Sequence, residues 1–160
     1  MYQVSSRISQ LIASATHLDT AGLRECTLRD IAAGVIRLSE MFTRGGSGIG
    51  TSYLEDAQLR QAYLAYYVPV NLAKVQILLS EVEPLLKGQT WKEFRVLDVG
   101  GGPGTGSLAL LDWVSSTSTP ALEALRVTVV DRSPAVLKAC TELWHGYLAQ
   151  VVAGQKLPLQ

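Results

Sequence analysis

The fold is decided by the stretch Val96-Leu97-Asp98-Val99-Gly100-Gly101-Gly102-Pro103-Gly104, a short apolar run that ends at an acid and a cluster of glycines. The run Phe94–Asp98 is typical of a buried strand, and Ser107–Val114 has the composition of a helix. Strand, turn and helix in this order place the glycines before a helix N-terminus, which offers unpaired amides and positive potential. We therefore expect a ligand to approach the backbone of Gly100–Gly106 closely.

A second strand and a second helix follow the first pair. Leu125–Asp131 is rich in β-branched residues, as a buried strand should be. Ser133 suits the N-cap of a helix and Pro134 suits its first position. The apolar face of this helix is expected to consist of Val136, Cys140, Leu143, Tyr147 and Val151. The order β-α-β-α predicts an α/β fold, in which helices cover a parallel sheet.

Roughly the first 90 residues are predicted to be all-helical. Their apolar residues recur at helical spacing, which indicates two helices between Val4 and about Phe42 and a further helix over Glu55–Tyr67. Pro69 is expected to break or restart that helix, because proline lacks an amide donor. The next apolar stripe consists of Val75, Leu78, Leu79, Val82, Leu85 and Leu86. The chain thus divides into a helical region, 1–90, and a strand-containing region, 91–160.

Two polar stretches separate these segments. Thr43–Gly50 holds four glycines and predicts a flexible linker, because no strand precedes it and no phosphate-loop register fits. Lys87–Thr90 predicts the turn that leads out of the helical region.

Composition favours one soluble domain. The chain has 160 residues, a hydrophobic share of 48% and a mean hydropathy of +0.19. Lys plus Arg equals Asp plus Glu at 14 each, so the charge gives no support for nucleic-acid binding. No apolar run approaches the roughly 18–20 residues that a membrane-spanning helix needs. The N-terminus has too few arginines for a transit peptide, and we expect a cytoplasmic protein that does not contact a membrane.

The cysteines and histidines predict neither a metal site nor a catalytic residue. Cys26 and Cys140 lie far apart without metal-ligand spacing and are expected to be buried free thiols. His17 and His145 have no chemical partner nearby in sequence and are expected to be ordinary surface or core side chains. No residue can therefore be named as a catalytic base.

The spacing of the glycines distinguishes two classes of cofactor. The dinucleotide fingerprint has glycines at positions one, three and six, but here the sixth position falls on Thr105 or Ser107, which disfavours NAD. The observed Asp98-x-Gly100-x-Gly102-x-Gly104 resembles motif I of class I S-adenosylmethionine-dependent methyltransferases. That resemblance implies that the loop passes under the methionine and ribose portions of S-adenosylmethionine. The implied cofactor-binding residues are Asp98, Gly100, Gly101, Gly102 and Gly104.

An acid at the end of the second strand extends the resemblance. One carboxylate there can accept hydrogen bonds from two cofactor hydroxyls, and Asp131 stands at this place. The alternative role for Asp131 is a helix cap, but Ser133 already suits that position. By resemblance, Asp131 binds the ribose and the neighbouring Arg132 packs beside the adenine.

The segment before the motif narrows the family. Ala62–Lys74, followed by Arg95–Asp98 and its glycines, resembles the methyltransferase-like family of the mitochondrial small ribosomal subunit and its bacterial relatives, over roughly residues 50–133. The family implies ribosomal RNA or the small subunit as a partner. Two interpretations of Tyr66, Tyr67, Asn71 and Lys74 remain open. In the first, these residues line the cofactor mouth or contact RNA. In the second, the tyrosines are a buried aromatic pair and Lys74 is a snorkelling lysine.

The resemblance implies a methyltransferase in which a nucleophile on the substrate attacks the methyl carbon of the cofactor. The alternatives are a non-catalytic ribosome-assembly factor that keeps the fold and, more weakly, an NAD-dependent oxidoreductase. Residues 91–160 then form the N-terminal half of a Rossmann-like domain, whose sheet normally has seven strands, whereas two are found here. We expect either a longer chain or a second copy that covers the open edge of the sheet.

Overall fold

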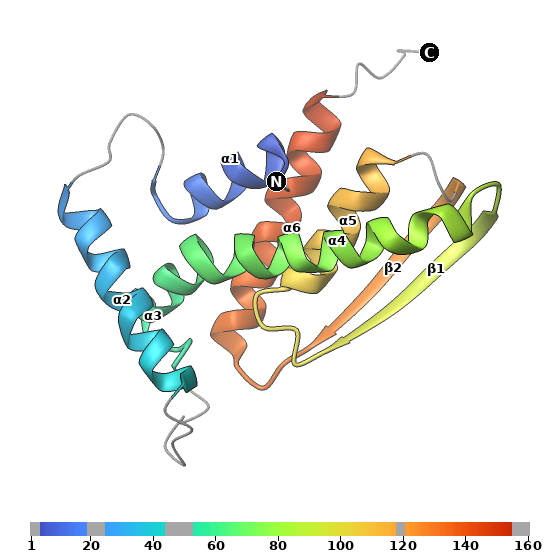
Figure 1. The fold of residues 1–160 in the computed structure, drawn as a ribbon. Coiled ribbons are helices and arrows are strands. Elements are labelled where there is room, and N and C mark those ends of the chain that lie inside the picture. The colour runs from blue at the N-terminus through green and yellow to red at the C-terminus, as the bar shows by residue number, and fades with distance from the viewer. Residues whose placement is uncertain (1–3, 19–24, 44–52, 118–120, 155–160) are drawn as a thin grey trace.

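The structure is a computed structural model that describes residues 4–18, 25–43, 53–117 and 121–154. Its fold is mixed α/β, with a helical N-terminal part followed by a parallel two-stranded sheet and its helices (Figure 1). The elements are α1 Ser6–Ala15, α2 Glu25–Thr43, α3 Ala57–Ala62, the π-helix η1 Tyr63–Tyr67, α4 Val68–Leu86, β1 Thr90–Val99, α5 Thr105–Ser116, β2 Ala121–Val130 and α6 Pro134–Gly154. The predicted order β-α-β-α is confirmed. Most of the predicted linker Thr43–Gly50 lies outside the described residues.

Both strands begin four residues before the predicted start. In the parallel register Thr90 pairs with Ala121 and Val99 pairs with Val130. The residues added to the start of β2 include Ala121 and Glu123, which have low strand propensity, so the ladder with β1 decides their conformation. At the other end, Asp131 follows β2 instead of closing it.

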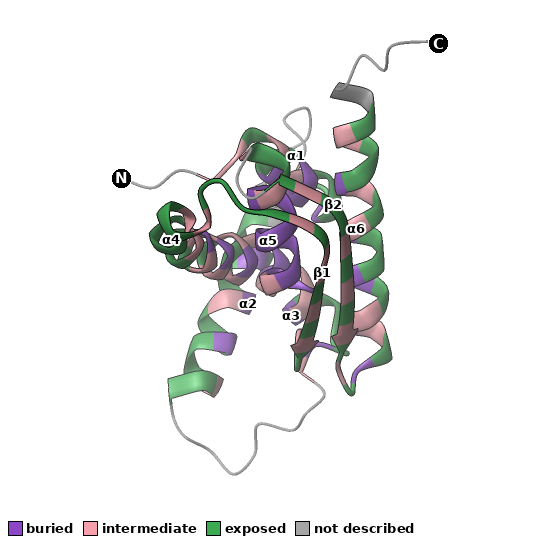
Figure 2. Ribbon diagram, turned by 90° about the vertical axis from the view of Figure 1, so that its right-hand side faces the viewer, coloured by how far each residue is buried: buried purple, intermediate pink, exposed green. Residues whose placement is uncertain are grey.

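The sheet is covered on one face only within the described residues. Phe94, Val96 and Asp98 alternate along β1 with exposed residues on the opposite face, where Leu97 is 65% and Val99 75% exposed. The prediction of buried strands is therefore wrong for this second face. Its physical cause is the placement of the helices, which lie against the other side of the sheet (Figure 2).

The core forms around α5. Almost every residue of α5 from Thr105 to Trp113 is buried, between α4 on one side and α1 and α6 on the other. The central buried residues are Ile8, Leu11, Ile12, Leu64, Val68, Leu72, Leu108, Ala109, Leu111, Leu143 and Tyr147. The predicted apolar face of α6 is confirmed, since Val136, Cys140, Leu143 and Tyr147 are buried and Val151 packs against the core.

Pro69 does not break the helix, but α4 begins at Val68 with Pro69 in its first turn, so the other predicted outcome, a restart at the proline, is confirmed. α3, η1 and α4 run on without interruption, and the amide of Val68 donates to the carbonyl of Tyr63 in a π-turn. In a regular helix the ring of Pro69 would clash with the carbonyl four residues earlier. The wider π-turn lies directly before the proline and accommodates it, and such turns are frequent at functional sites.

The predicted apolar stripe of α4 is also wrong in part. Leu78 and Leu85 are 68% and 74% exposed, whereas the buried face carries Val68, Leu72 and Gln76. Packing against α5 selects this buried face. The apolar residues of the C-terminal half of α4 are left on the surface.

Candidate functional site

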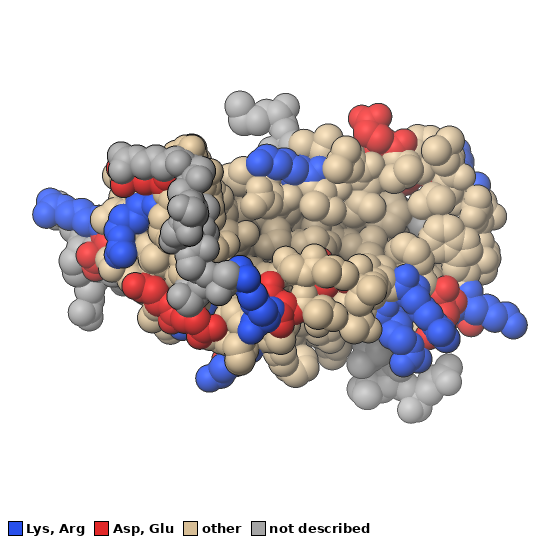
Figure 3. Space-filling view, turned by 90° about the horizontal axis from the view of Figure 1, so that it is seen from below, with Lys and Arg blue, Asp and Glu red and all other residues tan. Residues whose placement is uncertain are grey.

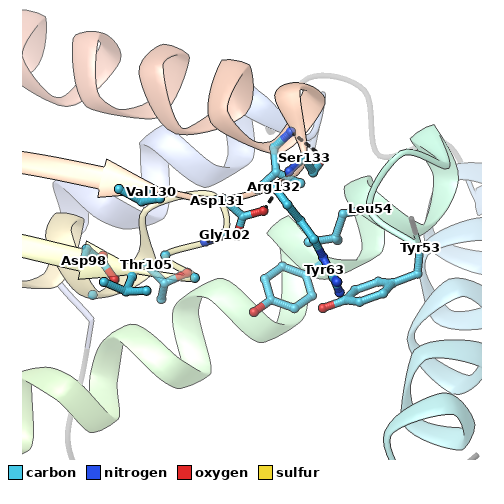
Figure 4. Close-up of a pocket in the computed structure, with 15 residues that line it drawn as sticks. Tyr53, Leu54, Tyr63, Asp98, Gly102, Thr105, Val130, Asp131, Arg132 and Ser133 are labelled. Carbon is cyan, nitrogen blue, oxygen red and sulfur yellow. Dashed lines mark hydrogen bonds between the residues drawn. The ribbon is translucent and has the colours of Figure 1, made fainter. Parts of the chain in front are cut away.

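The carboxyl ends of both strands border a cavity of about 760 Å³. Seen from below, this side of the molecule has few charges and is hollowed near its centre, with charged side chains of both signs around it (Figure 3). Figure 4 shows the lining side chains, which come from the glycine loop, from the end of β2 and from the N-terminal part. The lining includes Tyr53, Leu54, Tyr63, Asp98, Gly100, Gly101, Gly102, Thr105, Asp131, Arg132 and Ser133. This volume lies within the range of small-molecule sites, roughly 300–1,000 Å³.

The glycine loop needs glycine for its backbone conformation. Gly100 and Gly102 have φ of +67° and +57°, and a Cβ at either position would meet no atom within 4 Å. The amide of Gly100 donates to the carbonyl of Val130 at 2.7 Å, which ties the loop to the second strand. The loop therefore presents bare backbone to the cavity.

Asp98 holds the first turn of α5 from the end of β1. Its Oδ2 accepts from the hydroxyl of Ser107 at 2.6 Å and from the amide of Ser107 at 3.2 Å. Gly104 occupies the N-cap of α5 and has no side chain to cap the helix itself. The predicted site residue Asp98 thus lines the cavity and also caps α5 from a distance.

Asp131 joins the glycine loop to the start of α6. Its Oδ2 accepts from the amide of Gly102 and its Oδ1 from the amide of Ser133, both at 3.0 Å. Ser133 caps α6 as predicted, with its Oγ accepting from the amide of Val136 at 3.3 Å. Asp131 therefore also has a structural role at the start of α6, contrary to the expectation that Ser133 alone caps this helix. Each carboxylate oxygen keeps a lone pair that a ligand hydroxyl can use.

Thr105 is a lining residue that the sequence reasoning missed. Its Oγ1 is buried and has no hydrogen-bond partner among the described residues. A buried polar atom without a partner is uncommon in native structures, and a ligand atom in the cavity can satisfy it. Its position in the sequence could have predicted this, because Thr105 is the first helical residue after the glycine loop and faces the same cavity.

Tyr53 and Tyr63 close the cavity from the N-terminal part and were also missed. No motif spacing connects them with the glycine loop, because they precede it by some forty residues. The hydroxyl of Ser133 donates to Glu55, which anchors this segment beside α6. Burial raises the pKa of both phenols, and the nearby carboxylate of Asp131 adds to this. A phenol is protonated at neutral pH in any case, so both hydroxyls are available as hydrogen-bond donors.

Arg132 is exposed and borders the same cavity. Figure 4 shows its side chain extending from the end of β2 toward Tyr53 and Tyr63. Its positive charge lowers the pKa of Tyr53, in opposition to the larger effect of burial. The structure thus brings all the sequence-predicted residues to one place, with Gly104 just behind the loop against Cys140.

A second cavity of about 450 Å³ adjoins the first and shares Tyr53 and Tyr63 with it. Tyr66, Tyr67, Asn71 and Lys74 line it. Tyr66 is 49% exposed, so the interpretation of Tyr66 and Tyr67 as a buried pair is wrong. Tyr66 lies on the surface beside the cavity, whereas Tyr67 is half-buried and packs against the cluster of Leu38, Leu59 and Ala62.

Other chemistry is not apparent in the described part of the chain. No group of three or more His, Cys, Asp or Glu side chains comes together as a metal site requires. Among the described helices none is both long and apolar enough to cross a membrane. Cys140 is a buried free thiol, as predicted, whereas the side chain of Cys26 lies outside the described residues. His17 and His145 are exposed.

Comparison with known proteins gives no relatives. No family model matches the chain, and neither the curated proteins nor the solved structures contain a match.

Proposed function

We propose that this chain is the cofactor-binding portion of an S-adenosylmethionine-dependent methyltransferase. The observation that carries the proposal is one of placement. The loop Asp98-x-Gly100-x-Gly102-x-Gly104 and the carboxylate of Asp131 meet at the carboxyl ends of two parallel strands, on one cavity of about 760 Å³. Ligands of open α/β sheets bind at this end of the strands.

The residues present fit such a cofactor. Gly100 and Gly102 leave the space that a Cβ would fill, and Asp131 offers acceptors for ribose hydroxyls. The unpartnered hydroxyl of Thr105 offers a further contact. When bound, S-adenosylmethionine supplies an electrophilic methyl group on a sulfonium. The chain's own contribution is to position the reactants and to exclude water, which accounts for most of the catalysis in such transfers.

The finer fold assignment belongs to the same proposal. We interpret β1-α5-β2-α6 as the first half of a Rossmann-like class I methyltransferase sheet. Further strands of such a domain, or a second copy of the chain, would pair with the open edge of the sheet, and further helices would cover the exposed face at Leu97 and Val99. The N-terminal composition supports the proposal of a cytoplasmic protein, and the resemblance alone supports a methyl acceptor on or near ribosomal RNA.

Calorimetry on the 160-residue chain with S-adenosylmethionine, S-adenosylhomocysteine and NAD tests the cofactor. We expect the two sulfur compounds to bind in preference to NAD. Asp131→Asn removes the charge and should weaken binding by about 1.5–3 kcal/mol, or roughly tenfold or more. Glu142→Gln on the exposed face of α6 makes the same charge change and should leave affinity unchanged. Preference for NAD, or equal affinity in Asp131→Asn, would overturn the proposal.

Transfer of a labelled methyl group to RNA separates an enzyme from its closest alternative. A methyltransferase should label an acceptor in a total RNA preparation. Tight binding of S-adenosylhomocysteine without labelling of any cellular acceptor would instead identify a non-catalytic assembly factor that keeps the cofactor.

A further inference from the structure

Five of the ten residues that line the second cavity are aromatic. Phe42, Tyr53, Tyr63, Tyr66 and Tyr67 line its volume of about 450 Å³. Tyr53 and Tyr63 also line the cavity at the glycine loop, so the two volumes meet at these rings. A group seated in the aromatic cavity therefore lies next to the proposed cofactor.

The rings hold one another in fixed orientations. Tyr63 and Tyr67 stack at 5.4 Å with 24° between their planes. Phe42 and Tyr66 each meet the Tyr67 ring edge-on, at 5.3 Å and 5.1 Å. Because Tyr66 is 49% exposed, part of its surface is open to a ligand. Such preorganised rings lose little conformational entropy when a flat molecule stacks on them.

The charge of the lining selects among flat ligands. Lys74 is its charged side chain, and the described lining contains no carboxylate. Aromatic faces attract cations, but the ammonium of Lys74 would repel an amine or a cationic peptide side chain. Its Nζ donates to Oδ1 of Asn71 at 3.2 Å, and an ammonium group has two further hydrogens to donate. A flat neutral ring that carries an anionic group satisfies both features.

We propose that the aromatic cavity binds a nucleobase, with its phosphate at Lys74, as the methyl-acceptor subsite. This inference rests on the proposed function, because the base would reach the methyl donor past Tyr53 and Tyr63. The chain's formal charge of zero allows few phosphate contacts, so stacking must supply most of the affinity. Binding should therefore depend only weakly on salt.

Fluorescence anisotropy with a labelled single-stranded RNA of mixed sequence tests the subsite on the full chain. Tyr66→Leu removes a stacking face from a half-exposed position and should weaken binding at least about fivefold. Lys74→Gln should reduce the slope of log affinity against log salt by about 0.7, the share of one phosphate contact. Adenosine and uridine 5′-monophosphate as competitors show whether a free nucleotide binds as well as a strand does.

Two matched variants serve as controls. Trp91→Leu removes an aromatic ring at the opposite end of β1, and Lys138→Gln removes an exposed charge on α6. Neither should change RNA binding. RNA affinity that is equal in the wild type, Tyr66→Leu and Lys74→Gln would overturn the subsite.

Calorimetry with S-adenosylhomocysteine on the same variants distinguishes the two proposals. Its affinity should be unchanged in Tyr66→Leu and Lys74→Gln, which also shows that both variants are folded. Binding of S-adenosylhomocysteine without binding of RNA or mononucleotides would reject the nucleobase while leaving the proposed function intact. Absence of S-adenosylhomocysteine binding would reject the proposed function itself.

Discussion

Among the described glycines, only Gly104 combines a positive φ with a close contact at the position of a Cβ. Its φ is +76°, and a Cβ built there would lie 2.5 Å from the Sγ of Cys140, which is buried in α6. Gly88 has a similar φ of +80° but has nothing within 4 Å of a built Cβ. Comparing the two positions separates backbone strain from steric conflict at the glycine loop.

Gly104→Ala should destabilise the protein more than Gly88→Ala does. We expect about 1–2 kcal/mol at Gly88 from the left-handed backbone alone, and about 1–3 kcal/mol more at Gly104 from overpacking. Urea unfolding measures both. In a double-mutant cycle, Cys140→Ala should relieve the steric part of the Gly104→Ala effect. Equal losses at the two glycines would show that the contact with Cys140 is readily relieved.

At the scale of the element, α5 is a helix that another element caps. Its N-cap residue, Gly104, has no side chain, and the carboxylate of Asp98 at the end of β1 bonds to Ser107 instead. The negative charge of this carboxylate also interacts favourably with the positive end of the helix dipole. Since Asp98 ends β1 and bonds to the first turn of α5, the start of this central helix and the shape of the glycine loop depend on the same acid.

Asp98→Ala should therefore cost about 1–3 kcal/mol of the free energy of unfolding, and Asp98→Asn less, because the amide oxygen still accepts a hydrogen bond. Urea unfolding monitored by circular dichroism measures this. Asp56→Ala is the matched control, since Asp56 caps only the short helix α3, through the amides of Gln58 and Leu59 at 2.9 Å and 3.0 Å. A smaller loss in Asp98→Ala than in Asp56→Ala would contradict the capping role.

At the scale of the whole molecule, Asp112 connects four helical segments through one buried carboxylate. Its Oδ1 accepts from the hydroxyls of Ser5, before α1, and Tyr147, in α6, at 2.9 Å and 2.8 Å. Its Oδ2 accepts from Nε2 of Gln76 in α4 at 2.7 Å. Burial, with the carboxylate of Asp112 adding to it, raises the pKa of Tyr147 from 10.0 to about 12. Because the pKa of Tyr147 is higher in the folded than in the unfolded state, its protonated phenol stabilises the fold. This stabilisation is fully present below pH 10 and is lost as the pH rises toward 12.

Tyr147→Phe should lower stability at neutral pH by about 1–3 kcal/mol, the usual worth of a hydrogen bond to a charged group. It should also reduce the loss of stability between pH 10 and pH 12, because the group with the raised pKa is gone. Urea unfolding from pH 7 to pH 12 measures both effects. Ser5→Ala removes a bond to the same oxygen without removing a phenol, so it should lower stability and leave the alkaline slope unchanged. The same alkaline slope in Tyr147→Phe as in the wild type would be evidence against the raised pKa.

Much of the site could be predicted because its signals are local. The glycine loop, the acid after each strand and the Ser133 cap depend on neighbours a few residues away, through turn geometry and helix ends. Thr105 and Tyr63 were missed for different reasons. Thr105 carries no motif, whereas Tyr63 reaches the cavity only because the N-terminal helices pack beside the sheet.

The amino-acid sequence by itself determined the helical N-terminal part, the order β-α-β-α and the candidate loop, because hydrophobic period and turn residues act over short distances. The buried face of α6 was predictable, but only the tertiary structure decided which faces of α4 and of the strands are buried. The periodicity of α4 does not say which stripe meets α5, so the pattern predicts Leu78 and Leu85 on the buried face, whereas both lie on the surface. The same holds for Leu97 in β1: an apolar strand is buried only where another layer covers it, and that depends on how distant segments pack.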